Sequence, residues 1–93
     1  MIDKIPFLFV DDSISDNKYL SLLIKIKKMP IEPHFEGGGN QGIKYLFSCT
    51  KDSFPKVIFV DINMPLMNGF EFATRYKELF YEKHPDTFVF ITS

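Results

Sequence analysis

Three aspartates are the residues of this chain with the clearest chemical use. Asp11 and Asp12 directly follow the apolar run 7–10, and Asp61 directly follows the apolar run 57–60. Short, bounded apolar runs are typical of strands buried on both faces of a parallel sheet. Neighbouring strands lie about 4.8 Å apart, so their ends would bring the three carboxylates together. Carboxylates this close repel one another unless protons or a cation intervene, and such oxygen ligands favour Mg²⁺.

The elements that must hold these aspartates are predicted from apolar spacing and turn signals. Strands are expected at 5–10, 31–36, 57–60 and 88–91, and helices at 16–28, 40–50 and 70–82. The order βαβαβαβ predicts an α/β fold with one parallel sheet and helical crossovers. Open sheets of this kind bind ligands at their carboxyl edge, where the three aspartates and Thr92 would all lie.

Each predicted helix has an apolar face that should pack against the sheet. The residues expected to point inward are Leu20, Leu23 and Ile24 in the first helix, Ile43, Leu46 and Phe47 in the second, and Phe72, Tyr76, Leu79 and Phe80 in the third. Pro33 makes the strand 31–36 an edge strand, because proline cannot donate to a central ladder. Gly37-Gly38-Gly39 is predicted to be a turn. It is not a phosphate-binding loop, because the lysine and the hydroxyl residue of such a loop are missing.

The bulk composition predicts one small folded domain over residues 1–93. Hydrophobic residues make up 45% and charged residues 25% of the chain, and the net charge of −1 gives no general attraction to nucleic acid or to an anionic membrane. Cys49 is the single cysteine, which excludes an internal disulfide and favours a cytoplasmic location. No apolar run is long enough to cross a membrane. His34 and His84 are expected at the surface rather than in a catalytic site.

Three separate motifs then connect the chain to a known family. They are Phe-Val-Asp-Asp at 9–12, Val-Asp-Ile-Asn-Met-Pro-Leu-Met-Asn-Gly at 60–69 and Ile-Thr-Ser at 91–93. In this order, and at the ends of these strands, the motifs resemble the receiver domain of two-component response regulators, the domain type of CheY. The resemblance covers the whole chain and implies a flavodoxin-like parallel sheet.

The resemblance also implies a role for each residue of the acidic edge. Asp61 would be the phosphoacceptor, and Thr92 would donate its hydroxyl to a phosphoryl oxygen. Asp12 would bind Mg²⁺ directly, Asp11 mainly through water, and the backbone carbonyl of Asn63 would add a ligand. Met64, Pro65 and Gly69 would shape the loop after the acceptor. The phosphoryl group would come from a sensor histidine kinase or a phosphotransfer protein, and the domain would act as a switch that also catalyses loss of its own phosphate.

The chain departs from the family beyond the strand 88–91. Complete receivers continue with a helix, a strand that ends in a phosphoryl-contacting lysine, and a last helix, so the domain 1–93 is expected to be incomplete at its C-terminus. The apolar strand 88–91 would then be an exposed edge, which favours association and predicts a homodimer through that strand. Gly42 stands where many receivers have alanine, and glycine should weaken that helix.

Two other functions are compatible with the sequence. A truncated receiver could be an interaction module that binds metal but does not signal. A Mg²⁺-dependent phosphohydrolase also uses an aspartate at a strand end, but it places a second acid two residues later as general acid. Here that position is Asn63, which cannot protonate a leaving group, so the phosphohydrolase is the weaker alternative.

Overall fold

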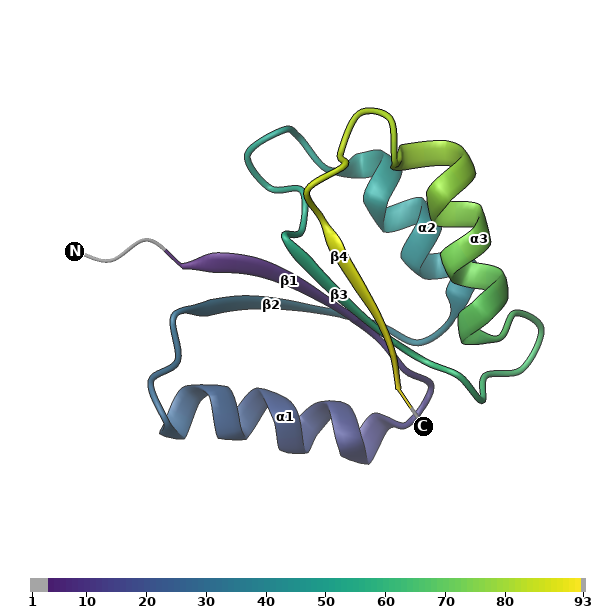
Figure 1. Ribbon diagram of the computed structural model, residues 1–93. Coiled ribbons are helices and arrows are strands. Elements are labelled where there is room, and N and C mark those ends of the chain that lie inside the picture. Colours follow the sequence, from purple (N-terminus) through teal and green to yellow (C-terminus); the bar gives the residue numbers. More distant parts are fainter. Residues whose placement is uncertain (1–3, 93) are drawn as a thin grey trace.

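The computed structural model describes residues 4–92 and confirms the predicted alternation of strands and helices (Figure 1). The elements are β1 (Ile5–Val10), α1 (Ile14–Ile26), β2 (Ile31–Glu36), α2 (Gly39–Ser48), β3 (Val57–Asp61), α3 (Gly69–Phe80) and β4 (Phe88–Thr92). Helix α1 begins earlier than predicted because Ser13 caps it, its hydroxyl accepting a hydrogen bond from the Asp16 backbone N–H. Within residues 4–92, no helix combines the length and the apolar character needed to cross a membrane.

The four strands form one parallel sheet in the order β2-β1-β3-β4. Helices α2 and α3 cover one face and α1 lies against the other (Figure 1). Strands β1 and β3 are the central pair, and β2, which contains Pro33, is an edge strand as predicted. This order sets the ends of β1 and β3, and so Asp11 and Asp61, side by side.

The face under α2 and α3 holds the hydrophobic core, and we call it the covered face. Its centre consists of fully buried side chains, each at most 2% exposed: Leu8, Val10, Leu46, Ile58, Val60 and Phe72. Small aliphatic residues of the strands alternate with the aromatic residues that point the other way. The covered face therefore supplies most of the close packing that stabilises the domain.

The opposite face carries a row of stacked aromatic rings, which we call the aromatic ladder. Phe35, Phe9, Phe59 and Phe90 come from β2, β1, β3 and β4, and neighbouring ring centroids lie 5.1, 5.5 and 5.3 Å apart. These distances match the spacing between strands because the four residues share one register row. Helix α1 covers the ladder only in part, and an open cavity of about 390 Å³ lies between them.

The prediction of burial is wrong for two residues. Phe47 is 63% exposed and Leu79 is 43% exposed. In α3, Phe72, Tyr76 and Phe80 repeat every four residues and form the buried row, so Leu79 falls beside it. Phe47 lies at the outer side of the seam between α2 and α3, where its ring packs on Phe80 at a centroid distance of 4.8 Å.

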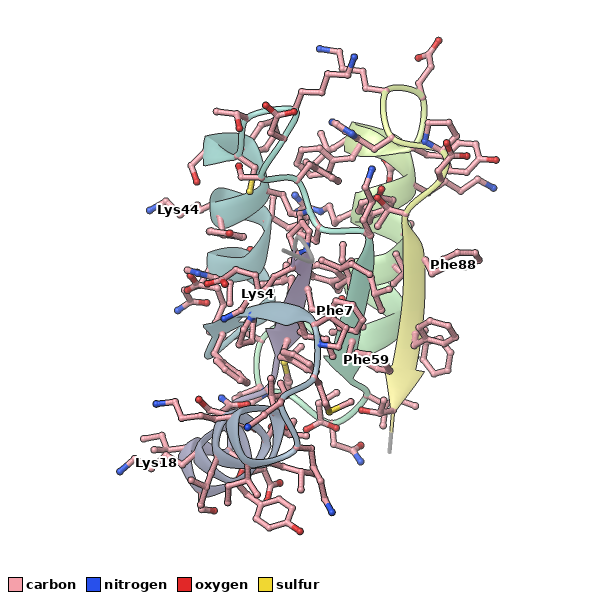
Figure 2. The ribbon with its side chains drawn as sticks, turned by 90° about the vertical axis from the view of Figure 1, so that its left-hand side faces the viewer. Lys4, Phe7, Lys18, Lys44, Phe59 and Phe88 are labelled. Carbon is pink, nitrogen blue, oxygen red and sulfur yellow. The ribbon has the colours of Figure 1, made fainter. Side chains whose placement is uncertain are left out.

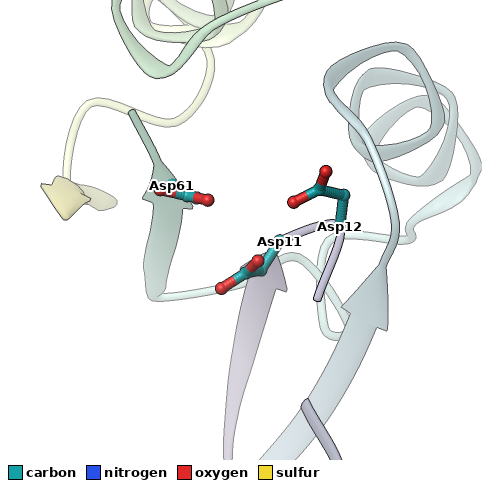
Figure 3. Close-up of side chains that lie close together, drawn as sticks. All are labelled: Asp11, Asp12 and Asp61. Carbon is teal, nitrogen blue, oxygen red and sulfur yellow. The ribbon is translucent and has the colours of Figure 1, made fainter. Parts of the chain in front are cut away.

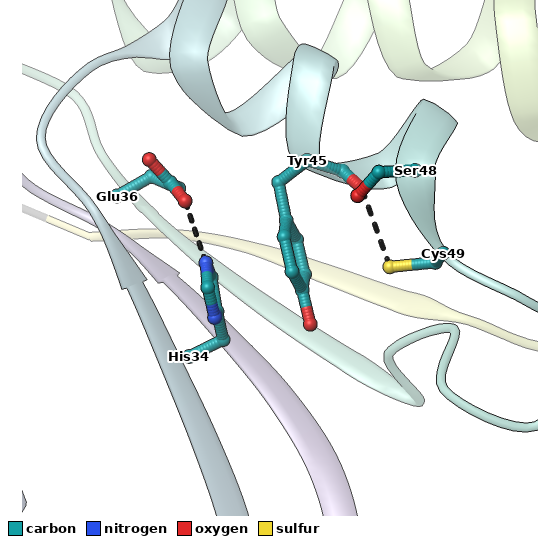
Figure 4. A network of polar contacts seen from close by, with 5 residues as sticks. All are labelled: His34, Glu36, Tyr45, Ser48 and Cys49. Carbon is teal, nitrogen blue, oxygen red and sulfur yellow. Dashed lines mark hydrogen bonds and ion pairs between the residues drawn. The ribbon is translucent and has the colours of Figure 1, made fainter.

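Both histidines are half-buried packing residues rather than fully exposed ones. His34 on β2 stacks on Tyr45 of α2, with ring centroids 3.6 Å apart, and its Nε2 contacts the Glu36 carboxylate (Figure 4). Cys49 is half-buried and donates its thiol to the Tyr45 carbonyl at 3.3 Å. Burial, assisted by Cys49, raises the pKa of Tyr45 to about 12. This network fastens the edge strand β2 to α2.

Candidate functional site

The structure brings the three predicted aspartates together at the carboxyl edge of the sheet. One carboxylate oxygen from each of Asp11, Asp12 and Asp61 lies within 4.8 Å of the others. Figure 3 shows Asp12 and Asp61 pointing toward one another, with Asp11 beside them. Asp12 is exposed and the other two are half-buried, so the cluster is open to solvent on one side.

Local hydrogen bonds fix two of the three carboxylates. The Ser13 N–H donates to Asp11 Oδ1 at 2.9 Å, and the Asn63 N–H donates to Asp61 Oδ1 at 3.1 Å. In both cases an aspartate at a strand end accepts from the backbone two residues later, which is the geometry of an Asx turn. The chain therefore orients these side chains through its own turns.

Negative charge accumulates in this cluster. Burial raises the pKa of Asp11, and the charges of Asp61, Asp16 and Asp12 act in the same direction, although the Ser13 N–H opposes them. A cation between the carboxylates would relieve this repulsion. Hard oxygen donors with an open side for water are the donor set that Mg²⁺ prefers, so these residues fit a hard divalent ion.

Thr92 lies next to the cluster on β4. It stands opposite Asp61 in the register of β3 and β4, and its hydroxyl donates to the Val60 carbonyl at 3.5 Å. Thr92 is exposed, and that long hydrogen bond leaves the hydroxyl able to turn toward a group bound at Asp61. The role of the Asn63 carbonyl as a ligand stays a prediction, since the contact seen at this residue is made by its N–H group.

Sequence reasoning missed Asn17. Its Nδ2 donates to the Asp11 carbonyl at 3.0 Å and so holds the turn between β1 and α1. Its Oδ1 is buried and has no hydrogen-bond partner among the described residues. Asn17 lies on the same helical face as Leu20 and Ile24. A polar residue within an apolar stripe is the sequence signal that could have identified it.

The start of α3 is held close to the acceptor strand. Asn68 and Glu71 form a capping box at the start of this helix. Gly69 was expected to shape the loop after the acceptor, but not through a left-handed conformation, because its φ is not positive. It is required by close approach instead, because a Cβ there would lie 3.0 Å from the Asp61 carbonyl oxygen and 3.0 Å from Ile91 Cγ2.

The loop between β3 and α3 is anchored by its methionines. Met64 and Met67 are each only 7% exposed, whereas Leu66 between them is 97% exposed. Leu66 also has a φ of 71°, a left-handed conformation that is unfavourable for a residue with a branched side chain. The buried methionines therefore hold a strained turn in the loop that follows Asp61.

Fold and site together define a class: a flavodoxin-like α/β domain with an acidic site at the carboxyl edge. No family model and no curated protein sequence matches the chain. Solved structures do match. A two-component response regulator from Legionella pneumophila is 30% identical, with a TM-score of 0.74 over 95% of this chain and 68% of that one.

Two further structures agree with this match. The chemotaxis protein CheY4 of Vibrio cholerae is 26% identical, with a TM-score of 0.77 over 97% of this chain and 72% of that one. A response regulator receiver protein from Pseudomonas putida, 16% identical, shares the fold with a TM-score of 0.79 over 100% of this chain and 70% of its own. The chain belongs to the CheY-like receiver domains of response regulators.

Proposed function

We propose that this domain receives a phosphoryl group on Asp61 and acts as a switch in two-component signalling in the cytoplasm. The donor is a sensor histidine kinase or a phosphotransfer protein that carries a phosphohistidine. The observation that supports this proposal is the group of three carboxylates within 4.8 Å of one another at the carboxyl edge of a receiver fold. A nucleophilic carboxylate beside two further acids is the arrangement that acyl phosphate formation needs.

The transfer is a displacement at phosphorus. A carboxylate oxygen of Asp61 bonds to phosphorus while the phosphorus–nitrogen bond of the donor breaks, and the imidazole leaves with that electron pair and takes up a proton from solvent. The Asn63 N–H holds Oδ1 of Asp61 at 3.1 Å and so limits the rotation of the carboxylate. In the return step water bonds to phosphorus, the bond to Asp61 breaks and inorganic phosphate leaves.

The neighbouring acids would hold Mg²⁺. Asp12, Asp61 and the Asn63 carbonyl are the direct ligands in this proposal, and Asp11 binds mainly through water. When bound, the ion neutralises charge on the phosphoryl oxygens. Asn17 keeps the Asp11 backbone in place, and the Thr92 hydroxyl contacts a phosphoryl oxygen once the group is on Asp61.

The proposal includes a homodimer formed through β4. Among the described residues this strand is a sheet edge, and Phe88 and Phe90 on it are 65% and 47% exposed. The net charge of −1 gives no electrostatic basis for contact with nucleic acid.

Phosphoryl incorporation tests the central claim. The protein is incubated with phosphoramidate and Mg²⁺ and its intact mass is measured. One phosphoryl adduct is expected in the wild type, none in Asp61→Asn, and an unchanged adduct in the control Asp52→Asn, which alters an exposed acid on another loop. A folded wild type that takes up no phosphoryl group would contradict the proposal and support an interaction module that only binds metal.

A further inference from the structure

The end of the sheet opposite the acidic cluster carries a second polar cavity. It has a volume of about 430 Å³ and lies between the loop that precedes β3 and the loop that precedes β4. Both loops lie at the end of the molecule away from the C-terminal end of β4 (Figure 1). Strand β3 separates Lys56, in the wall of this cavity, from Asp61 by about 16 Å. The cavity is therefore distinct from the acidic site.

Contacts between the two loops hold the walls of the cavity in place. The Thr87 hydroxyl donates to the Pro55 carbonyl at 2.8 Å. The ring of His84 stacks on the buried ring of Phe54 with a centroid distance of 3.5 Å. Each contact joins one loop to the other, so the backbone that carries the polar side chains of the cavity has a fixed arrangement.

The positive charge of this cavity is not neutralised within the protein. Lys51, Lys56 and Lys83 line it together with a single acid, Asp86. Both ion pairs found within residues 4–92 involve the glutamates of β2 instead. Burial, with Lys83 and Lys56, lowers the pKa of the neighbouring His84. Three lysines against one aspartate leave an excess of two positive charges, although the whole chain has a net charge of −1.

These side chains suit a small anion that carries more than one charge. The ammonium group of lysine is a compact charge with three donors, and it binds phosphate oxygens as a point charge. The half-buried imidazole of His84 can donate to the same oxygens. A volume of about 430 Å³ is within the range of small-molecule sites. A single carboxylate would neutralise only part of the charge, whereas a phosphate or pyrophosphate group would neutralise it fully.

We propose that this cavity binds a phosphate-bearing small molecule. Lys51, Lys56 and Lys83 supply the opposite charge, and His84 supplies a ring donor. The bound anion bridges the loops before β3 and β4, so it stabilises the folded domain. This site is independent of the phosphoacceptor role proposed for Asp61, because the two lie at opposite ends of β3.

Proton NMR of the two histidines tests the site, with pyrophosphate as the probe. In Mg²⁺-free buffer at constant ionic strength, the Cε1–H signal of His84 should shift with pyrophosphate until it saturates. The signal of His34 is the internal control, because this residue contacts Glu36 on β2 and does not line the cavity. A His84 signal that does not shift, or that shifts no more than His34, would overturn the proposal.

The pKa of His84 gives a second readout. The charged and titratable groups around its ring and backbone are Lys51, Lys56, Lys83, Asp86, Cys49 and Tyr76, whose hydroxyl donates to the His84 carbonyl at 2.9 Å. A bound anion adds negative charge to this set, so the pKa of His84 should rise. An unchanged pKa at saturating pyrophosphate would mean that the anion binds elsewhere, and the proposal would be wrong.

Removal of matched pairs of lysines identifies the binding groups. The double variant Lys56→Gln/Lys83→Gln should bind pyrophosphate about three to ten times more weakly than the wild type. The control is Lys18→Gln/Lys44→Gln, which removes the same charge from the side chains that Figure 2 shows projecting outward from α1 and α2. This control should bind as the wild type does. Equal weakening in both double variants would show a non-specific attraction and would overturn the site.

A comparison of anions tests the chemical class of the ligand. Pyrophosphate should bind more tightly than acetate, which carries one charge, and at least as tightly as a short oligothymidylate. Tighter binding of the oligonucleotide would indicate an extended surface for polyanions, and the small-molecule site would be wrong. Asp61→Asn should bind pyrophosphate like the wild type. Phosphoryl uptake is measured separately, so failure at this cavity leaves the result at Asp61 unaffected.

Discussion

The two faces of the sheet are built from the same strands but differ in how closely helices cover them. On the covered face, Leu8, Val10, Ile58 and Val60 are at most 1% exposed under α2 and α3. On the other face, the aromatic ladder is only partly covered by α1, and its outer ring Phe90 is 47% exposed. Adjacent residues along each strand alternate between the two faces.

This difference separates the side chains that stabilise the fold by close packing from those that remain partly exposed. Close packing of small aliphatic side chains against helices gives the covered face its stability. Large rings on the other face form their contacts with each other, strand to strand, and the outermost of them remain exposed. The acidic cluster lies at the end of the central strands, so it is positioned by the covered face and bordered by the open one.

Truncation of a buried side chain of α3 should have the largest effect on stability. Phe72 is fully buried, so Phe72→Ala should lower the free energy of unfolding by about 3–5 kcal/mol, through lost burial and the cavity left behind. Phe88→Ala, on the open face, should cost less than about 1 kcal/mol. Urea unfolding of both variants, with Phe72→Leu as a milder change, measures the difference. Equal losses for the two alanine variants would show that the two faces contribute alike.

Metal binding should stabilise the site between the faces. If Mg²⁺ occupies the cluster, a concentration of about 100 times its dissociation constant raises the free energy of unfolding by about 2.7 kcal/mol. Asp12→Asn should lose most of that gain and should be more stable than the wild type without metal, because one repelling charge is removed. Thermal unfolding with and without MgCl₂ measures both effects. An equal gain in the variant would mean that Asp12 is not a ligand.

Glycine substitutions compare a packed position with an open one. A Cβ at Gly42 would lie 3.0 Å from both Phe72 Cε2 and Val10 Cγ2, whereas a Cβ at Gly37 meets nothing within 4 Å. Gly42→Ala should therefore cost about 1 kcal/mol despite the better helix propensity of alanine, since the covered face would be overpacked. Gly37→Ala should stabilise by about 0.4–1 kcal/mol through the unfolded chain. Relative to the wild type, the urea midpoint should fall for Gly42→Ala and rise for Gly37→Ala. A stabilised Gly42→Ala would show that the covered face can adjust to the added methyl group.

The smallest effect concerns pH at the rim of the covered face. His84 stacks on Phe54 at 3.5 Å, and burial, with Lys83 and Lys56, lowers the pKa of His84 below 6.5. The unfolded chain then binds this proton first as pH falls, so stability is complete above pH 6.5 and declines toward the lowered folded pKa. The loss should stay below about 1 kcal/mol because His84 is partly exposed.

Stability measured as a function of pH tests this prediction for His84. The variant His84→Gln should have a flatter profile between pH 7.5 and 5 than the wild type, and Lys83→Gln should reduce the slope in part. An unchanged slope in His84→Gln would assign the pH dependence to other groups.

Much of the fold could be predicted because its signals are local. The apolar runs 7–10 and 57–60 each lie within a few residues, and the order of the predicted strands and helices predicted the parallel sheet. The predictions failed where a side chain's fate depends on a neighbouring element. Phe47 and Leu79 lie next to buried residues of their own helices, but the structure turns other residues of α2 and α3 toward the core and leaves these two exposed.

At the candidate site, too, local features could be predicted from the sequence and contacts between distant segments could not. The placement of Asp11, Asp12 and Asp61 at strand ends follows from the sequence, whereas Asn17 became visible only through its contact with the Asp11 carbonyl. Gly69 was noticed for the wrong reason, because a close approach to β3 and β4 cannot be inferred from the loop alone.

The sequence by itself determined the order of elements, the chemistry of the acidic edge and the resemblance to receivers, since motif residues and strand ends are neighbours along the chain. Only the tertiary structure decided the spacing of the carboxylates and the alignment of Phe35, Phe9, Phe59 and Phe90 into one row. The physical reason is that a period of two shows which residues of a strand share a face. Strand register, and the choice of face that the helices cover, arise only when separate segments pack together.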